Sequence, residues 1–315
     1  MKRYFKTALE LAKQTFKEYS ADKAPRLGAA LSYYTVFSLA PVLILVISIA
    51  GLAFGKEAAQ GRIVSELQGV LGPEGAEGVQ TMLAKANDTG SGIVSTVVGF
   101  LMLLVGATGV LIELQGAINT VWKVAPKPGG GIKELIRERL LSFGLILSFG
   151  FILLVSLVVS ALLAGLGGMM SKIIPGWVIF GYLLNYAVAL GVMTALIAMI
   201  YKILPDVKIA WRDVWVGALV TSVLFQIGKF AIGLYIGKAS VGSPFGAAGS
   251  LAVLLVWVYY SSQIILLGAE FTRVSALRRG ARIEPTPHAV RIDQSAAAVT
   301  PGRVSTTAPE PAGSR

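Results

Sequence analysis

The sequence predicts an all-α, polytopic membrane protein with six transmembrane helices, an amphipathic N-terminal helix and an outer helical hairpin. The first observation is composition: 55% of the 315 residues are hydrophobic, only 14% are charged, and the mean hydropathy is +0.71. A soluble domain of this length carries more charge than that. The second observation is a series of six long apolar runs, and the third is an alternation of Lys and Arg between successive loops. Together they indicate repeated crossing of a bilayer.

The N-terminal segment, residues 1–27, predicts an amphipathic helix at the cytoplasmic face or membrane interface. Its apolar positions recur at spacings of four and three: Phe5, Leu9, Ala12, Phe16 and Tyr19. Lysines lie off that stripe, so one helical face is apolar and the other basic. Such a helix lies on a membrane with its basic side at anionic headgroups, or it packs on the protein's own cytoplasmic face. The sequence leaves both alternatives open.

Residues 28–272 are predicted to form the transmembrane domain. The six apolar runs are 31–53, 93–116, 140–166, 177–200, 214–236 and 247–269. Each can span, because ~20 residues rising 1.5 Å each cross the ~30 Å hydrocarbon layer. Between the first two runs, residues 55–92 carry two helical patterns separated by Gly72 and Pro73. This segment predicts a helical hairpin that caps the outer face.

The distribution of Lys and Arg predicts the topology. Twenty-two of the 28 lie in the N-terminal segment, the 119–139 loop, the 201–213 loop and the C-terminal tail, whereas five lie in the alternate segments. The positive-inside rule therefore places both termini in the cytoplasm. The tail, residues 273–315, is basic and becomes rich in Pro, Ala, Ser and Thr, so it is predicted to be disordered.

Polar side chains recur on restricted faces of the apolar runs. The candidate residues of a substrate pathway are Tyr34, Ser38, Pro41, Glu113, Gln226, Lys229, Tyr260, Gln263 and Glu270. Lipid does not solvate such groups, so these faces need a protein or water neighbour. They line either a polar cavity or the seams between packed helices.

Some of these residues also have simpler interpretations. Glu113 falls about 30 Å along its run, near the cytoplasmic boundary, where it can close a helix end. Lys229 can snorkel outward, and it is too far from Glu113 and Glu270 for direct pairing. The amides of Gln226 and Gln263 fall nearer the middle of the bilayer, and they are expected at positions where they can face each other.

The composition also argues against several function classes. The chain has no cysteine, which excludes disulfides, iron–sulfur clusters and thiolate metal sites, and it has no Gly-Lys-Ser/Thr phosphate loop. Its one histidine, His288, lies in the tail, and Asp206 and Asp213 flank a short loop without evident partners. This weighs against a metal-dependent ribonuclease. We expect no cofactor and no nucleic-acid partner, because anionic membrane lipids account for the basic surface.

Four blocks carry a family resemblance: YYTVFSLAPVLILVISIAG, GVLIELQGAINTVWKV, WRDVWVGALVTSVLFQIGKF and SPFGAAGSLAVLLVWVYYSSQIILLGAEFTR. Over roughly residues 10 to 275, the chain resembles the YihY/virulence factor BrkB family of bacterial inner-membrane proteins. Family members often carry Tyr where this chain has Phe245. The resemblance implies six spans with cytoplasmic termini in the inner membrane. Members have been labelled ribonuclease BN, linked to serum resistance, and associated with the movement of lipid or glycolipid precursors.

Two functions are consistent with these observations. The first is a transporter or flippase-like carrier that moves a lipid, a glycolipid precursor or a small amphiphile through a polar-lined intramembrane cavity. The alternative is a non-transporting scaffold that anchors an envelope assembly through the 55–92 hairpin and the tail. In that case the polar faces are helix seams.

Overall fold

The computed structural model describes residues 2–87, 109–127, 144, 148, 177–239 and 249–292. Its elements are α1 (Lys2–Ala21), α2 (Ala24–Phe54), α3 (Lys56–Asn87), β1 (Val124–Pro126), α6 (Trp177–Ile203), α7 (Trp211–Ala239), α8 (Gly249–Arg278) and β2 (Ala289–Arg291). Residues 109–121 are also helical. The protein is therefore mostly helical, as predicted, with one short two-stranded sheet.

Within the described residues, four helical segments are long and apolar enough to cross a membrane. They are Ala24–Ser48, Leu183–Ile203, Trp211–Ile232 and Gly249–Arg278. These segments correspond to the predicted first, fourth, fifth and sixth runs. Most of 93–116 and nearly all of 140–166 lie outside the described residues, so the predicted count of six is not confirmed.

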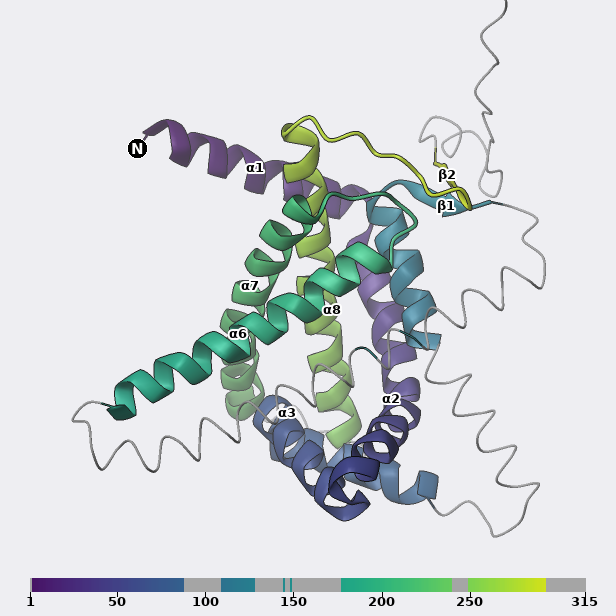
Figure 1. Ribbon diagram of the computed structural model, residues 1–315, viewed down its shortest axis with the longest axis vertical. Helices are drawn as coiled ribbons and strands as arrows, with labels where there is room; N and C mark the ends of the chain where they lie inside the picture. The colour runs from purple at the N-terminus through teal and green to yellow at the C-terminus, as the bar shows by residue number, and fades with distance from the viewer. Residues whose placement is uncertain are drawn as a thin grey trace, which may run out of the picture.

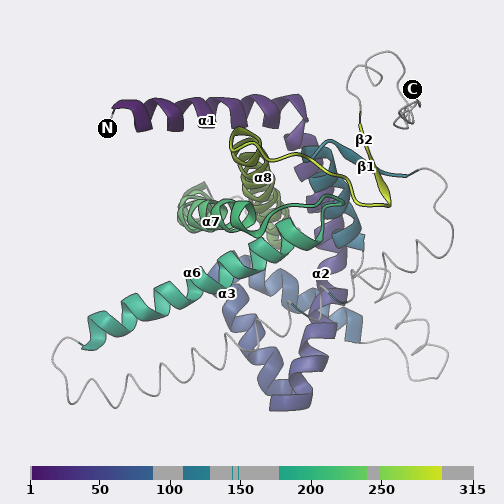
Figure 2. The same cartoon turned by 45° about the horizontal axis from the view of Figure 1, so that its top comes forward.

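Helix α8 is the axis around which the other helices are arranged. It contacts α7, α2, α3 and α1, and it passes between α7 and α2 in Figure 1. Helix α1 lies across one end of the bundle, whereas α3 lies at the opposite end. Helix α6 packs on α7 and extends obliquely away from the other helices (Figure 2).

Glycines allow α8 to lie close to α7 and to Tyr201 of α6. A side chain at Gly228 of α7 would begin 2.7 Å from the Tyr260 hydroxyl, and one at Gly268 of α8 would begin 2.6 Å from the Tyr201 hydroxyl. The Tyr201 hydroxyl donates a hydrogen bond to the Ile265 carbonyl at 2.6 Å. This seam matches the preference of membrane helices for small residues and interhelical hydrogen bonds at close crossings.

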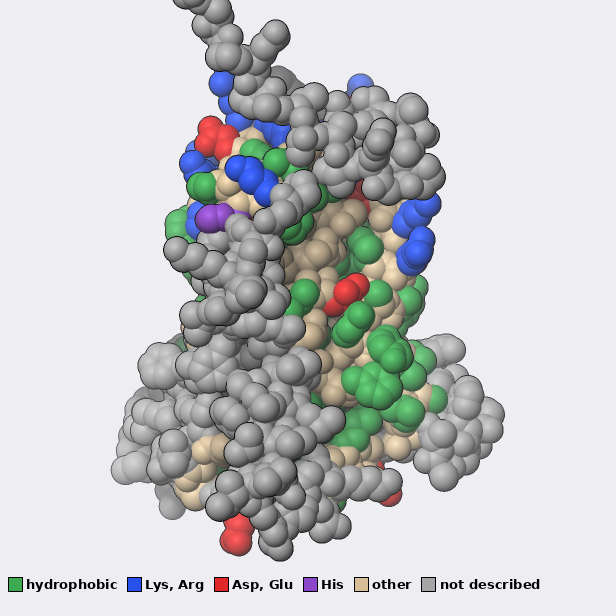
Figure 3. Space-filling view, turned by 90° about the vertical axis from the view of Figure 1, so that its right-hand side faces the viewer, with side chains coloured by type: hydrophobic (Ala, Val, Ile, Leu, Met, Phe, Trp, Pro, Cys, Tyr) green, Lys and Arg blue, Asp and Glu red, His purple; other side chains and the backbone are tan. Residues whose placement is uncertain are grey.

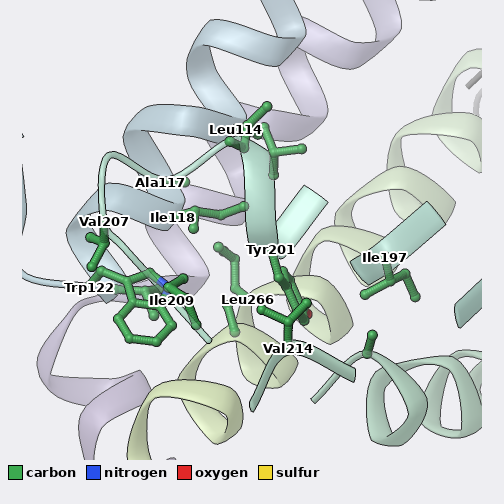
Figure 4. Close-up of a cluster of buried hydrophobic side chains, with 14 of the residues drawn as sticks. Leu114, Ala117, Ile118, Trp122, Ile197, Tyr201, Val207, Ile209, Val214 and Leu266 are labelled. Carbon is green, nitrogen blue, oxygen red and sulfur yellow. The ribbon is translucent and has the colours of Figure 1, made fainter. Parts of the chain in front are cut away.

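The main hydrophobic core combines residues of α8, the 109–121 helix, the α6–α7 loop and β1, and Figure 4 shows part of it. Ile118 and Trp122 come from the 109–122 segment and lie near Val207 and Ile209 of the α6–α7 loop. Leu266 of α8 faces the same cluster and is fully buried. These apolar contacts fix the 109–121 helix and the α6–α7 loop relative to α8.

The C-terminal segment is ordered well beyond the predicted boundary at residue 273. Helix α8 continues to Arg278, and β2 then pairs antiparallel with β1, with Val124 opposite Arg291. The Lys208 amide also donates to the Glu284 carbonyl at 2.9 Å. The prediction of a disordered tail therefore does not hold for residues 273–292, because backbone pairing with distant segments orders a polar stretch whose composition gives no such signal. Residues 293–315 lie outside the described residues.

Helix α3 differs from the predicted two-helix hairpin. It runs as one helix from Lys56 to Asn87, including Gly72 and Pro73, and residues 88–92 lie outside the described residues. Its Val79 and Leu83 are buried against α2 and α8. This packing accounts for a helix that continues through a proline, although proline removes one backbone hydrogen bond. The hairpin is not confirmed.

Candidate functional site

Five ionisable side chains gather where α1, α8 and the end of the 109–121 helix meet. We call them the charge ring: Glu18, Asp22, Lys123, Glu270 and Arg273. The Lys123 ammonium pairs with the Asp22 carboxylate and lies 3.9 Å from Glu18 Oε2. Arg273 Nη1 lies 3.0 Å from Glu18 Oε2 and 3.5 Å from Glu270 Oε2. Three segments far apart in the sequence thus meet through their charges.

The charge ring is largely withdrawn from solvent. The side chain of Glu270 is 0% exposed and that of Asp22 is 6% exposed, whereas Glu18 is 27% exposed. Glu270 Oε1 and Oε2, Asp22 Oδ2 and Arg273 Nε are buried without a hydrogen-bond partner among the described residues. Burying charged groups is unfavourable unless they are paired and hydrogen-bonded. The site is therefore only partly satisfied.

Two residues with left-handed backbone conformations flank the charge ring. Lys23, with φ of 53°, turns the chain from α1 into α2 immediately after Asp22. Lys123, with φ of 57°, follows the 109–121 helix and leads into β1. This conformation costs a non-glycine residue about 1 kcal/mol. Contacts with surrounding residues therefore stabilise both turns. The turns bring the side chains of Asp22 and Lys123 together.

A second polar contact joins α1 to α8. The Tyr19 hydroxyl donates a hydrogen bond to Gln263 Oε1, while Gln263 Nε2 is buried without a partner among the described residues. A side chain at Gly28 of α2 would overlap the Gln263 amide. Burial, assisted by the nearby Tyr259, raises the pKa of Tyr19 above 10.0. Gln263 is therefore held between the first two helices.

The structure brings only some of the predicted pathway residues together. Gln263 and Glu270 both face the end of α1, whereas Tyr260 packs against Gly228 of α7. Ser38 is buried, with its hydroxyl 3.6 Å from where a side chain would begin at Gly109. The predicted pathway residues of α8 thus face two different neighbours.

Other predicted residues lie apart from this site. Tyr34 is 44% exposed and shares a surface with Tyr33 and Phe37, whereas Pro41 is partly buried inside α2. Three more predicted residues are partly buried and form no hydrogen bond or ion pair with another described residue: Glu113, Gln226 and Lys229.

Among the described residues, no contact joins the amides of Gln226 and Gln263, which were expected at positions where they can face each other. Gln263 is turned toward Tyr19, while its neighbour Ile264 faces α7 near Gly228. Successive helical residues point about 100° apart, so the two faces differ.

Sequence reasoning missed four members of the charge ring: Glu18, Asp22, Lys123 and Arg273. Arg273 had a local signal, because it follows Glu270 by three residues and so lies on the same side of a helix. Glu18 of α1 and Asp22, which directly follows α1, are likewise four residues apart. Nothing local connects these pairs with Lys123.

The α6–α7 loop carries a separate polar cluster. Asn119 Nδ2 donates to Asp206 Oδ2 at 2.8 Å, and the Asp206 amide donates back to Asn119 Oδ1 at 2.8 Å. Asp213 pairs with Arg279 at 2.8 Å. Both aspartates therefore have partners, contrary to the expectation from sequence. Across the part of the chain that the structure describes, no three His, Asp or Glu side chains are grouped to hold a metal ion.

Basic side chains are unevenly distributed over the molecule. On the face shown in Figure 3, Lys and Arg gather in the half that carries α1 and the sheet, and hydrophobic side chains form a patch on the described part of the other half. This polarity follows the loop asymmetry in the sequence.

The profile of the family described as virulence factor BrkB matches residues 15–293. A UPF0761 membrane protein of Verminephrobacter eiseniae is 30% identical over 265 residues, which cover 82% of this chain and 60% of that protein. A second, from Pseudomonas paraeruginosa, is 27% identical, with 85% and 63% covered. The chain thus spans less than two thirds of these two relatives.

Another UPF0761 membrane protein, from Pseudoalteromonas translucida, is 26% identical over 265 residues, which cover 84% of each chain. No solved structure matches the chain. The family profile covers most of the sequence, and these relatives are named as membrane proteins. The chain is therefore an integral membrane protein that belongs to the virulence factor BrkB family.

Proposed function

We propose that this protein carries an amphiphilic solute, such as a lipid or a glycolipid precursor, across the membrane. The observation that carries the proposal is the charge ring, which includes two side chains of a candidate membrane span, Glu270 and Arg273. Ionisable groups within membrane spans are costly, and they commonly mark substrate or ion pathways. The carboxylate oxygens of Glu270 lie near Arg273 but accept no hydrogen bond from another described residue, which favours a working site over a static ion pair.

In this proposal, the route toward the other end of the bundle runs along the polar side chains beside the seam of α7 and α8, which opens during carriage. Tyr260 lies about 15 Å along α8 from Glu270 and touches α7 at Gly228. Lys229, which follows Gly228 in α7, is partly buried and has no ionic partner among the described residues. An ammonium group at this depth suits the phosphate or carboxylate of an amphiphile. In this proposal, the charge ring closes the end of the route beneath α1.

The surface of α1 supports an orientation in the membrane. Leu9 and Phe16 are 47% and 58% exposed, and Lys13 and Lys17 are exposed nearby. Apolar and basic side chains exposed on one helix suit the boundary between acyl chains and anionic headgroups. The proposal places α1 and both termini at the cytoplasmic face of a bacterial inner membrane.

A second candidate function is a non-transporting scaffold. The specific observation in its favour is the close seam of α7 and α8, where Gly217 abuts Thr272 and Gly268 abuts Thr221. Such seams serve a rigid multi-pass anchor equally well. Neither candidate includes ribonuclease activity, so degradation of tRNA by the highly purified chain would require a different function.

Reconstitution separates the two candidates. The full chain is placed in liposomes with fluorescent phospholipid, and the fraction of probe that a membrane-impermeant quencher reaches is followed over time. Carriage predicts faster exchange than in empty liposomes, with loss of that excess in Lys229→Ala and Glu270→Gln but not in Gly116→Ala, an exposed control position. A solute-uptake panel is run alongside, and no acceleration in either assay supports the scaffold.

A further inference from the structure

The charge ring contains an odd number of charges, which prevents complete alternation of sign. Followed through its contacts, the order is Asp22, Lys123, Glu18, Arg273 and Glu270. The ring closes where the Glu270 carboxyl lies beside the Asp22 carboxyl, within reach of one shared hydrogen bond. Two acids are therefore neighbours at this single point.

The unpartnered oxygens of the charge ring belong to this same pair. They are Asp22 Oδ2, Glu270 Oε1 and Glu270 Oε2, and all three are buried. Ionised carboxylates only accept hydrogen bonds, so neither acid can satisfy the other. Among the described members of the charge ring, Arg273 Nε is the only buried donor without a hydrogen-bond partner.

The other groups around the pair do not supply the missing positive charge. Lys123 and Arg273 already contact Glu18 as well, which leaves three carboxylates against two cations. From α1 and α8, the uncharged Tyr19 and Gln263 bond to each other. In the turn between α1 and α2, Lys23 follows Asp22, but Lys23 is exposed. A buried cluster with one excess negative charge is unfavourable.

We propose that Asp22 and Glu270 together bind one small monovalent cation, either a proton shared between the two carboxyls or an alkali ion. Either source supplies the one positive charge that the ring lacks and occupies the unpartnered oxygens. Since Asp22 directly follows α1 and Glu270 lies in α8, an occupied site joins the two helices. An empty site leaves two like charges in contact and favours their separation.

This inference deepens the proposed carriage by naming its coupling ion, and only the coupling role rests on that function. Binding itself is a property of the folded chain and is measured without liposomes. Loss of carriage with an intact cation response would refute transport alone. Carriage without any cation response would refute the cation site alone.

The test is thermal unfolding of the full chain in detergent. One arm lowers the pH at constant NaCl, and the other replaces choline chloride by NaCl or KCl at constant pH and ionic strength. We expect the unfolding temperature of the wild type to rise in one arm, and this rise to be absent from Glu270→Gln. Glu10→Gln, an exposed acid on α1, should respond as the wild type does. The arm that responds identifies the cation.

Equal responses of wild type and Glu270→Gln in both arms would overturn the proposal. If Glu270→Gln does not accumulate, Asp22→Asn receives the same measurement, and two assays of the wild type remain. Infrared spectroscopy detects a protonated carboxyl, and radioactive sodium or rubidium detects a bound alkali ion. Absence of both signals would also overturn the site.

Discussion

Tyr19 of α1 donates a hydrogen bond to Gln263 of α8, which joins the first and last described helices across 244 positions of sequence. The charge ring lies beside this contact and joins the same two helices. Helix α1 is consequently part of the bundle at its C-terminal end, where Thr15 is buried. Toward the other end, Leu9 remains exposed. The C-terminal end of α1 therefore packs on the protein's own helices, which is one of the two alternatives for this helix.

Removing the Tyr19 hydroxyl should weaken the attachment of α1. We expect Tyr19→Phe to lower the free energy of unfolding by about 1 kcal/mol, because one partly buried hydrogen bond is lost and Gln263 is left with two unpaired polar atoms. Thermal unfolding in detergent measures this change. Tyr33→Phe is the matched control, since Tyr33 is 59% exposed and forms no hydrogen bond among the described residues. Equal effects of both substitutions would contradict the assignment.

Gly28→Ala should act through the same hydrogen bond. Its new methyl group would displace the Gln263 amide, which is the flexible end of a long side chain, so we expect a loss of about 1 kcal/mol. The effects of Gly28→Ala and Tyr19→Phe should not add, because each breaks one shared contact. A double-mutant cycle of unfolding free energies tests this, and additivity would refute it. Gly116→Ala, where no atom lies within 4 Å, should be neutral or stabilising.

Alkaline pH should release α1. Burial, with a smaller effect of Tyr259, raises the pKa of Tyr19 above 10.0, so the folded state holds the phenol proton more tightly than the unfolded chain does. The resulting stabilisation is complete below pH 10 and is lost as the pH rises through the folded-state pKa. Unfolding temperatures from about pH 8 to pH 11 should fall more steeply for the wild type than for Tyr19→Phe. Parallel curves would exclude this contribution.

Asn119→Ala should loosen the α6–α7 loop. The substitution removes both hydrogen bonds between Asn119 and Asp206 and leaves the backbone amide of Asp206 unpaired. We expect the free energy of unfolding to fall by about 1–3 kcal/mol. Limited proteolysis should then cut within residues 204–210 faster than in the wild type. Thr120→Ala serves as control, because its hydroxyl bonds only its own helix at the exposed Gly116 carbonyl. Unchanged cleavage in Asn119→Ala would count against the loop contact.

Truncation tests the ordered C-terminal segment. A chain ending at Gly280 loses the pairing of β2 with β1, together with the bond from the Lys208 amide to the Glu284 carbonyl. We expect its unfolding free energy to fall by about 2 kcal/mol. A chain ending at Ile292 keeps these bonds and should match the full-length protein in thermal unfolding. Indistinguishable stability of the two truncated chains would show that residues 281–292 contribute nothing.

Local sequence patterns predicted the features that depend on local chemistry. The length of an apolar run and a 3.6-residue periodicity are properties of neighbouring residues, so α2, α7 and α8 and the amphipathic α1 were predicted close to their positions. The same reasoning failed at Pro73, where packing of α3 on α2 and α8 maintains a helix through a proline.

The charge ring could not be predicted, because its contacts join positions far apart. Glu18 and Arg273 are 255 residues apart, and Lys123 and Asp22 are 101 apart. No spacing rule connects such pairs. The order of residues 281–292 was missed for a related reason, since it depends on backbone partners around residues 124 and 208. By contrast, Gln263 and Glu270 were identified from polarity within an apolar run alone.

The closure of the charge ring has a consequence for biosynthesis. Helix α1 leaves the ribosome before α8, yet two of the ionic partners of Glu18 and Asp22 belong to α8. Until α8 has been synthesised and inserted, Glu18 and Asp22 cannot reach Arg273 and Glu270. Helix α1 is therefore docked only after the much later α8 has been made, and a nascent chain stalled before α8 would expose α1 to proteases.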